Sequence, residues 1–185
     1  MHTYYHDAEL PYDGSQLASL FAYKRFGLQG DSMTAFCGSC DIPWQHMVDQ
    51  EDVLEASPIY SDSMLHFIIE HFETPLTLMV TRQRLLVMLA KEQLETLSRR
   101  ALGRRGDDLF FEGRKLSISI ATVSPVSGLI HFALNLNTQR VPVPAASLAE
   151  LGVAEPDRFA ESLMRAYTDE VDSIRLATCK VKGVD

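Results

Sequence analysis

Three charged residues in the middle of the chain could do chemistry together: Asp107, Asp108 and Lys115. A lysine ammonium offers a mobile positive charge to a phosphate or a carboxylate. An aspartate can hold Mg²⁺, which prefers carboxylates combined with substrate phosphates. These residue types favour a phosphate or acyl-adenylate site. The alternative is a solvated hairpin whose cross-strand ion pair contributes less than about 1 kcal/mol.

A predicted β-hairpin would position these residues. Two runs suited to strands, Leu109–Phe111 and Arg114–Ala121, flank the short turn signal Glu112-Gly113. The second run alternates apolar and polar residues, which is typical of a strand with two different faces. Its apolar residues are Leu116, Ile118 and Ile120. We expect this apolar face to pack on helices and the polar face to meet solvent.

The pairing of this hairpin brings the polar side chains together. A turn centred on Glu112-Gly113 places Phe110 opposite Lys115 and Asp108 opposite Ser117. Asp108 and Lys115 are then diagonal neighbours within reach of each other. A third strand, at 130–137, adds polar residues that can join this face: His131, Asn135 and Asn137.

The cysteines allow a different chemistry. Cys37 and Cys40 form a CxxC pair, which can be redox-active or half of a zinc site. His46 is the one nearby candidate for another zinc ligand, and the residues after Cys40 do not suit the helix that a thioredoxin-like motif opens. Two free thiols near a loop are therefore favoured.

Histidines and acids gather in a predicted helix that starts at Ser61 or Asp62 and ends near Phe72. Asp62, His66 and Glu70 would share one face of it by their i, i+4 spacing. The string HFIIEH lacks the HExxH arrangement of metalloproteases. A polar helix stripe, or a histidine oriented by an acid, is favoured over a metal site.

The composition predicts a folded chain. Its 185 residues suit one domain, 1–185, and a hydrophobic fraction of 46% with 23% charged residues allows a packed core. A net charge of -8 argues against nucleic acid as the main partner. Apolar runs fall short of the roughly 20 residues of a membrane span, and the first ten residues lack an apolar signal core. We expect a cytoplasmic protein without a membrane partner.

Periodicity predicts an irregular alternation of helices and strands. Besides the elements above, the sequence predicts strands at 32–37 and 76–80. Helices are expected at 16–26, 81–101 and 155–178. With three strands clustered in a meander, this order indicates an α+β fold with a mostly antiparallel sheet.

Two resemblances support this reading. The strings GDDLFFEGRKLSISIA and GLIHFALNLN resemble the core of biotin and lipoate protein ligases, where an N-D-(I/L)-x-x-x-G-(R/K)-K-(I/L) hairpin precedes a G-x-N-x-N strand. Nearly the whole chain, from YDGSQL to GRKLSISIATVSPVS, also resembles an uncharacterised microbial family known as a domain of unknown function. That resemblance implies the fold of class II aminoacyl-tRNA synthetases and biotin synthetases, a mixed, mostly antiparallel sheet flanked by helices.

The ligase resemblance also implies roles for residues. Lys115 matches the lysine that binds the carboxyl and phosphate region of the acyl-adenylate. Asp108 matches the acidic position, and Asp107 stands where the ligases have asparagine. Asp107 and Asp108 would hold Mg²⁺ if ATP is used. The residues expected to bind and orient the substrate are Ser117, Asn135, Asn137, Arg105 and Arg114.

The function stays open between three hypotheses. The first is a ligase-like or acyltransferase-like enzyme acting on a small carboxylic acid. The glycine- and arginine-rich loop of the ligases is missing, and octanoyl transferases share the fold without ATP, pairing a lysine with a cysteine nucleophile such as Cys40 or Cys37. The second is a non-catalytic module that binds a small acid or nucleotide. The third is a thiol-redox or zinc protein using Cys37 and Cys40. The fold also allows a homodimer.

Overall fold

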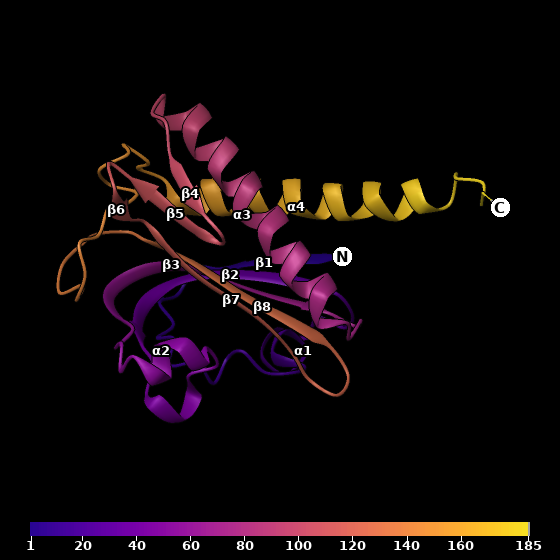
Figure 1. The fold of residues 1–185 in the computed structure, drawn as a ribbon, viewed down its shortest axis with the longest axis horizontal. Coiled ribbons are helices and arrows are strands. Elements are labelled where there is room, and N and C mark those ends of the chain that lie inside the picture. Colours follow the sequence, from indigo (N-terminus) through magenta and orange to yellow (C-terminus); the bar gives the residue numbers. More distant parts are fainter. Residues whose placement is uncertain (185) are drawn as a thin grey trace.

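A five-stranded sheet forms the centre of the computed structural model, which describes residues 1–184 (Figure 1). The strand order is β1-β2-β3-β8-β7, with β1 and β2 parallel and the other neighbours antiparallel. The strands are β1 (His2–His6), β2 (Ser32–Asp41), β3 (Tyr60–His71), β7 (Ser117–Val123) and β8 (Gly128–Asn135). The predicted α+β class with a mostly antiparallel sheet is confirmed. The end of the expected domain, at residue 185, lies outside the described residues.

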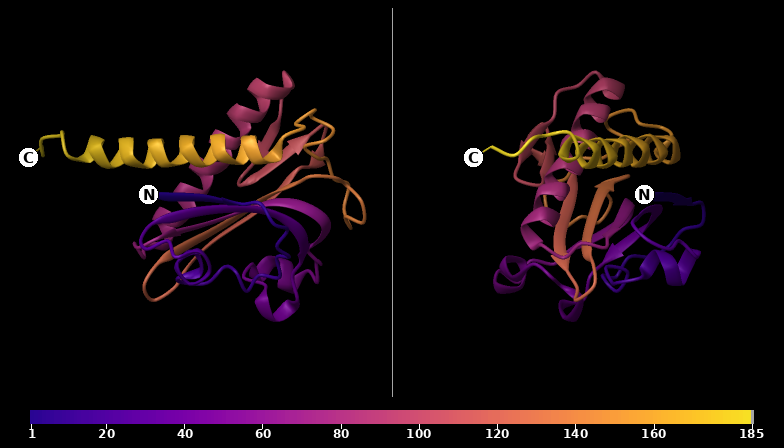
Figure 2. Two further views of the ribbon diagram at one scale, coloured as in Figure 1. Left: turned by 180° about the vertical axis from the view of Figure 1, so that it is seen from behind. Right: turned by 90° about the vertical axis from the view of Figure 1, so that its right-hand side faces the viewer.

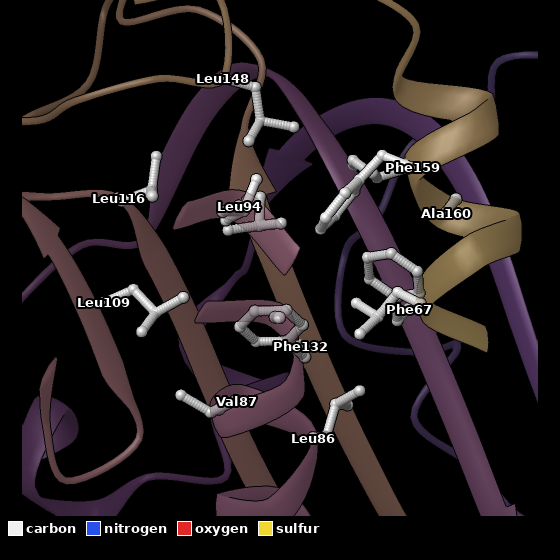
Figure 3. Close-up of a cluster of buried hydrophobic side chains, with 14 of the residues drawn as sticks. Phe67, Leu86, Val87, Leu94, Leu109, Leu116, Phe132, Leu148, Phe159 and Ala160 are labelled. Atoms are coloured by element: carbon white, nitrogen blue, oxygen red, sulfur yellow. The ribbon is translucent and has the colours of Figure 1, made fainter. Parts of the chain in front are cut away.

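Two long helices cover one face of this sheet: α3 (Leu76–Ser98) and α4 (Pro156–Thr178) (Figures 1 and 2). Apolar side chains of the helices meet those of the strands in the main core, because each element buries its apolar side. Figure 3 shows part of this core, including Phe67, Leu86, Val87, Leu94, Phe132, Phe159 and Ala160. No helix among residues 1–184 has the length and apolar character needed to cross a membrane.

A small second sheet lies beside the first. It contains β4 (Gly103–Arg105), β5 (Asp108–Phe111) and β6 (Arg114–Lys115) in that order. Glu112 and Gly113 both have positive φ, as a two-residue hairpin turn requires. The predicted turn and the pairing of Phe110 with Lys115 are confirmed.

The predicted strand Arg114–Ala121 is divided between the two sheets. β6 ends at Lys115, and the chain enters the main sheet as β7 after the buried Leu116. Leu116 packs in the helix-side core, but Ile118 packs with the opposite cluster of buried residues. The prediction that Leu116, Ile118 and Ile120 share a helix-packed face was therefore wrong, because the alternation of side chains is interrupted at Leu116.

The other face of the main sheet carries three short helices in long connections. They are α1 (Phe21–Phe26), the 3₁₀ helix η1 (Trp44–His46) and α2 (Gln50–Leu54). Figure 2 shows α1 and α2 on the side of the sheet away from α3 and α4. The helix expected at 16–26 is thus shorter than predicted, although it ends at Gly27, which has positive φ.

Two predicted elements exchange type. The segment predicted as a helix from Ser61 to Phe72 is strand β3, which is buried on both faces and so does not show a simple alternation of apolar and polar residues. The strand predicted at 76–80 is the beginning of α3, which follows Pro75 directly. His66 and Glu70 still share a face, because alternate residues of a strand point the same way. The register with β2 shifts between Gly38 and Cys40, so this alternation does not extend to Asp62.

Candidate functional site

A cavity of about 440 Å³ lies on the sheet face opposite α3 and α4. Its floor includes Tyr12, Met64, Ile118 and His131, and its walls come from the connection between β2 and β3 and from residues 141–145. This volume falls within the range of small-molecule sites. Segments far apart in the sequence therefore meet around one space.

Lys115 and Asp108 form an ion pair in the wall of this cavity. Lys115 Nζ lies 2.9 Å from Asp108 Oδ2, as expected for diagonal neighbours in the hairpin. Burial raises the pKa of Asp108, and the nearby ammonium opposes this shift. The Lys115 backbone is fixed by Pro144, whose carbonyl accepts its N–H, and by Ala146, which donates to its carbonyl.

Asp107 also reaches the cavity, but α3 holds its carboxylate. Oδ2 accepts a hydrogen bond of 2.7 Å from Gln83 Nε2, and Oδ1 lies 3.2 Å from Arg84 Nη1. Gln83 also donates to Ser119. Across residues 1–184, no group of three or more histidines, cysteines, aspartates or glutamates is arranged to hold a metal ion. Asp107 is held by α3, whereas Asp108 is held by Lys115.

Asn135 and Ser117 secure the hairpin to the main sheet. Asn135 Nδ2 donates to the Ala146 carbonyl at 3.1 Å and to the Lys115 carbonyl at 3.4 Å. Ser117 Oγ, which is fully buried, accepts the Leu109 N–H at 2.8 Å. Both residues line the cavity. These hydrogen bonds hold the backbone of the hairpin that carries Lys115.

Three residues expected at the substrate lie elsewhere. Asn137 follows β8, and its side chain accepts the N–H of Gln139. Arg105 stacks over the Phe110 ring at 5.3 Å. Arg114 binds the Ala145 carbonyl and pairs with Glu150 at 2.6 Å. None of the three lines the cavity. Among the described residues that do, Lys115 is the only lysine or arginine.

Acidic residues of α2 and its N-cap complete the walls. Asp49, Glu51 and Asp52 join Asp107 and Asp108 in the lining. Burial raises the pKa of Asp52, with a further contribution from Asp49, while Lys115 lowers it. Sequence reasoning missed these acids, because no local motif indicates that the β2–β3 connection folds over the Lys115 hairpin.

Two buried histidines contact each other, and one of them, His131, lines the cavity floor. His66 Nδ1 is 3.1 Å from His131 Nε2, and His66 Nε2 is 3.3 Å from the Gly38 carbonyl oxygen. Tyr12 stacks on His131 with ring centroids 3.9 Å apart. Burial lowers the pKa of His66 to about 4, and burial followed by repulsion from His66 lowers that of His131 well below its usual value. The sequence placed His131 on the polar face but did not pair it with His66.

The two cysteines of the CxxC pair lie on opposite faces of β2. Cys37 packs against the helix-side core, with Sγ 3.5 Å from the Tyr5 hydroxyl, whereas Cys40 is fully buried in the opposite cluster. Burial raises the pKa of Cys40 to about 12 and also raises that of Cys37. Neither thiol lines the cavity. The geometry supports neither a dithiol pair nor a cysteine nucleophile at Lys115.

Comparison with known proteins identifies the family. The family described as "Domain of unknown function (DUF366)" matches residues 1–182. The chain belongs to this family. An uncharacterized protein from Methanocaldococcus jannaschii is 35% identical to this DUF366 protein over 171 residues, covering 89% of this chain and 77% of the relative.

Solved structures share the fold at different levels of identity. A protein of unknown function from Pyrococcus horikoshi matches with a TM-score of 0.91 and 40% identity, over 98% of this chain and 100% of its own. A biotin protein ligase mutant from Aquifex aeolicus in complex with biotin matches with a TM-score of 0.61 and 12% identity, over 93% of this chain and 70% of its own. A lipoate-protein ligase A bound with ATP matches with a TM-score of 0.59 and 15% identity, over 93% of this chain and 86% of its own. This DUF366 protein therefore has the biotin/lipoate ligase fold, as the sequence resemblance implied.

Proposed function

We propose that this DUF366 protein binds a small carboxylic acid in the cavity, with the carboxylate on Lys115. The observation that carries the proposal is the position of Lys115, the only lysine or arginine among the described lining residues, beside a cavity of about 440 Å³. The ligase fold supports the same choice, since a solved relative of that fold is a biotin protein ligase in complex with biotin.

The surroundings of Lys115 suit a monoanion. Its ammonium is already paired with Asp108 at 2.9 Å, so an entering carboxylate shares the ammonium, which has three hydrogen-bond donors. Burial favours the protonated form of Asp108, as its raised pKa indicates. A protonated Asp108 would leave the full charge of Lys115 for the ligand.

A nucleotide fits less well than an acid. Five carboxylates line the cavity, and a triphosphate would add negative charge next to them. Asp107 already accepts from Gln83 and pairs with Arg84, so a Mg²⁺ ion bound there would compete with these contacts. We therefore propose binding of the acid as the function, and acyl activation with ATP and Mg²⁺ remains a prediction from the sequence alone.

Calorimetry with paired probes tests the proposal. Octanoate, lipoate and biotin are each compared with their methyl esters, which lack the charge. A charge-assisted hydrogen bond is worth about 1.5–3 kcal/mol, so we expect at least one acid to bind about ten- to a hundredfold more tightly than its ester. Lys115→Met should abolish this preference. Pyrophosphate release from ATP and Mg²⁺ with the same acids measures activation separately.

Lys91→Met is the matched control, because Lys91 pairs with Glu95 on α3, away from the cavity. It should leave the preference for the acid unchanged. The proposal is wrong if every acid and ester bind equally, or if Lys115→Met retains the preference.

A further inference from the structure

The hydrogen bonds of the buried histidines fix which ring nitrogens carry hydrogen. The Gly38 carbonyl can only accept, so His66 Nε2 is the donor in their 3.3 Å contact. Because burial keeps both rings neutral near pH 7, His66 Nδ1 then has a lone pair. His131 Nε2 must donate to it at 3.1 Å. The partners thereby assign His131 a tautomer whose Nδ1 carries no hydrogen.

This nitrogen is an unused acceptor in the cavity. His131 lines the cavity, and Nδ1 has no hydrogen-bond partner among residues 1–184 and is not sealed off by protein atoms. Tyr12 covers one face of the ring. The neighbouring lining includes apolar side chains from Met64, Ile118 and Ile120. Because this nitrogen faces the cavity, water can donate to it when no ligand is bound, and a ligand that displaces this water must itself donate a hydrogen bond to it.

The backbone positions of His131 and Lys115 are well separated along the direction of β8. His131 and Asn135 are both on β8, and Asn135 donates to the Lys115 carbonyl. Four residues of strand span about 13 Å. Between the two positions lies Ile118, which pairs with Ala133 on the same side of the sheet. The cavity is therefore charged at one end, apolar along the floor and able to accept a hydrogen bond at the other end.

We propose that the cavity selects a small acid that carries an N–H or O–H group at the end remote from its carboxylate, and that His131 Nδ1 accepts this hydrogen. His66 is a positioning residue, because it holds the tautomer of His131. This substrate class rests on the proposed function, since Lys115 defines the end that takes the acid. An acid with a plain alkyl end, or with an acceptor there, leaves the lone pair unmatched.

Three probes of equal chain length test this selectivity. They are ω-hydroxyoctanoate, which donates; ω-methoxyoctanoate, which only accepts; and octanoate, which does neither. We expect the hydroxy acid to bind about tenfold or more tightly than the methoxy acid. The preference for acid over methyl ester is measured on the same probes. Loss of that preference overturns the proposed function, whereas loss of the hydroxy preference overturns only the role of His131.

Two substitutions distinguish the role of His131 as the hydrogen-bond acceptor from the role of His66 as the positioning residue. His131→Gln can keep a donor toward His66 but has no acceptor at the Nδ1 position, so it should bind hydroxy and methoxy acids alike. His66→Leu offers no acceptor to His131 Nε2, so it no longer fixes the hydrogen there, and the preference for the hydroxy acid should shrink. Lys115→Met should keep the hydroxy preference while losing the acid preference.

The tautomer can be read without any ligand. A long-range proton–nitrogen NMR spectrum of the wild-type histidine rings should show His131 with hydrogen on Nε2, whereas His66→Leu should show both tautomers of His131. A wild-type spectrum with hydrogen on Nδ1 overturns the proposal even if the variants fail to fold. Equal hydroxy preference in the wild type and in His131→Gln overturns it as well.

Discussion

Substitution of Gly38 should damage both the fold and the cavity floor. In β2, a Cβ on Gly38 would overlap the carbonyl oxygen of Leu10 and lie 2.6 Å from its carbonyl carbon, whereas real Cβ contacts stay beyond 3.0 Å. Since both groups are backbone, no side-chain rotation relieves the overlap. Gly38→Ala must therefore push the segment around Leu10 away from β2.

That movement breaks a short ladder of backbone hydrogen bonds. Leu10 donates to Cys37 at 2.9 Å, Tyr12 donates to Ser39 at 2.8 Å, and Asp41 donates to Tyr12 at 3.0 Å. At about 1 kcal/mol each, their loss lowers the free energy of unfolding by about 3 kcal/mol. For a chain of this size we expect Tm to fall by about 6–12 °C. Tyr12 would also leave the ring of His131.

Thermal unfolding followed by circular dichroism measures the effect. Gly103→Ala is the matched control, because Gly103 also lies in a strand and its Cβ would meet nothing closer than 3.6 Å. The control should unfold within about 2 °C of the wild type. If Gly38→Ala unfolds like Gly103→Ala, the close approach of Leu10 does not constrain the fold and the reasoning is refuted.

Two further predictions concern ionisable groups. The hydrogen bond to His71, helped by the Phe72 N–H, lowers the pKa of Asp31 from 3.8 to about 2. The ionised Asp31 carboxylate adds about 2 kcal/mol to the free energy of unfolding above pH 4, and this is lost as the pH falls through 2. In Asp31→Asn, the free energy of unfolding should change less between pH 4 and pH 2 than in the wild type, and an unchanged pH dependence would exclude the contribution. Cys40, with a pKa raised by burial to about 12, should resist iodoacetamide in the native protein while the exposed Cys179 reacts. Rapid native labelling of Cys40, mapped by mass spectrometry, would contradict its burial.

Local signals in the sequence were sufficient for the hairpin and for the last helix. Glu112 and Gly113 mark a turn that depends only on neighbouring residues, and the pairing of Phe110 with Lys115 follows from it. The helix predicted at 155–178 is α4, which has Pro156 at its first position. Such features need no knowledge of what packs against them.

Long-range burial explains the elements that sequence reasoning missed. β3 is central in its sheet, so both of its faces are buried and its pattern does not distinguish a strand from a buried helix. The reversal of faces after Leu116 arises because the chain crosses from one sheet to the other there. No periodicity within 114–121 reveals that crossing.

The candidate site was predictable in part. Asp108, Lys115, Ser117 and Asn135 all line the cavity, as their expected shared face suggested, and Asp107 lines it as well. The acids of α2 and the contact between His66 and His131 depend on segments that meet only in the folded chain. Asn137, Arg105 and Arg114 were also expected at the site, yet none of the three lines the cavity.

The assembly of the cavity from distant segments has a practical consequence. Tyr12, the β2–β3 connection, the Lys115 hairpin and His131 all contact the same space, so any occupant links parts of the chain that otherwise separate on unfolding. An occupant at a hundred times its Kd would add about 2.7 kcal/mol to the folded state, a rise in melting temperature of about 5–11 °C. A metabolite library can therefore be screened by heat alone, before any reaction is known.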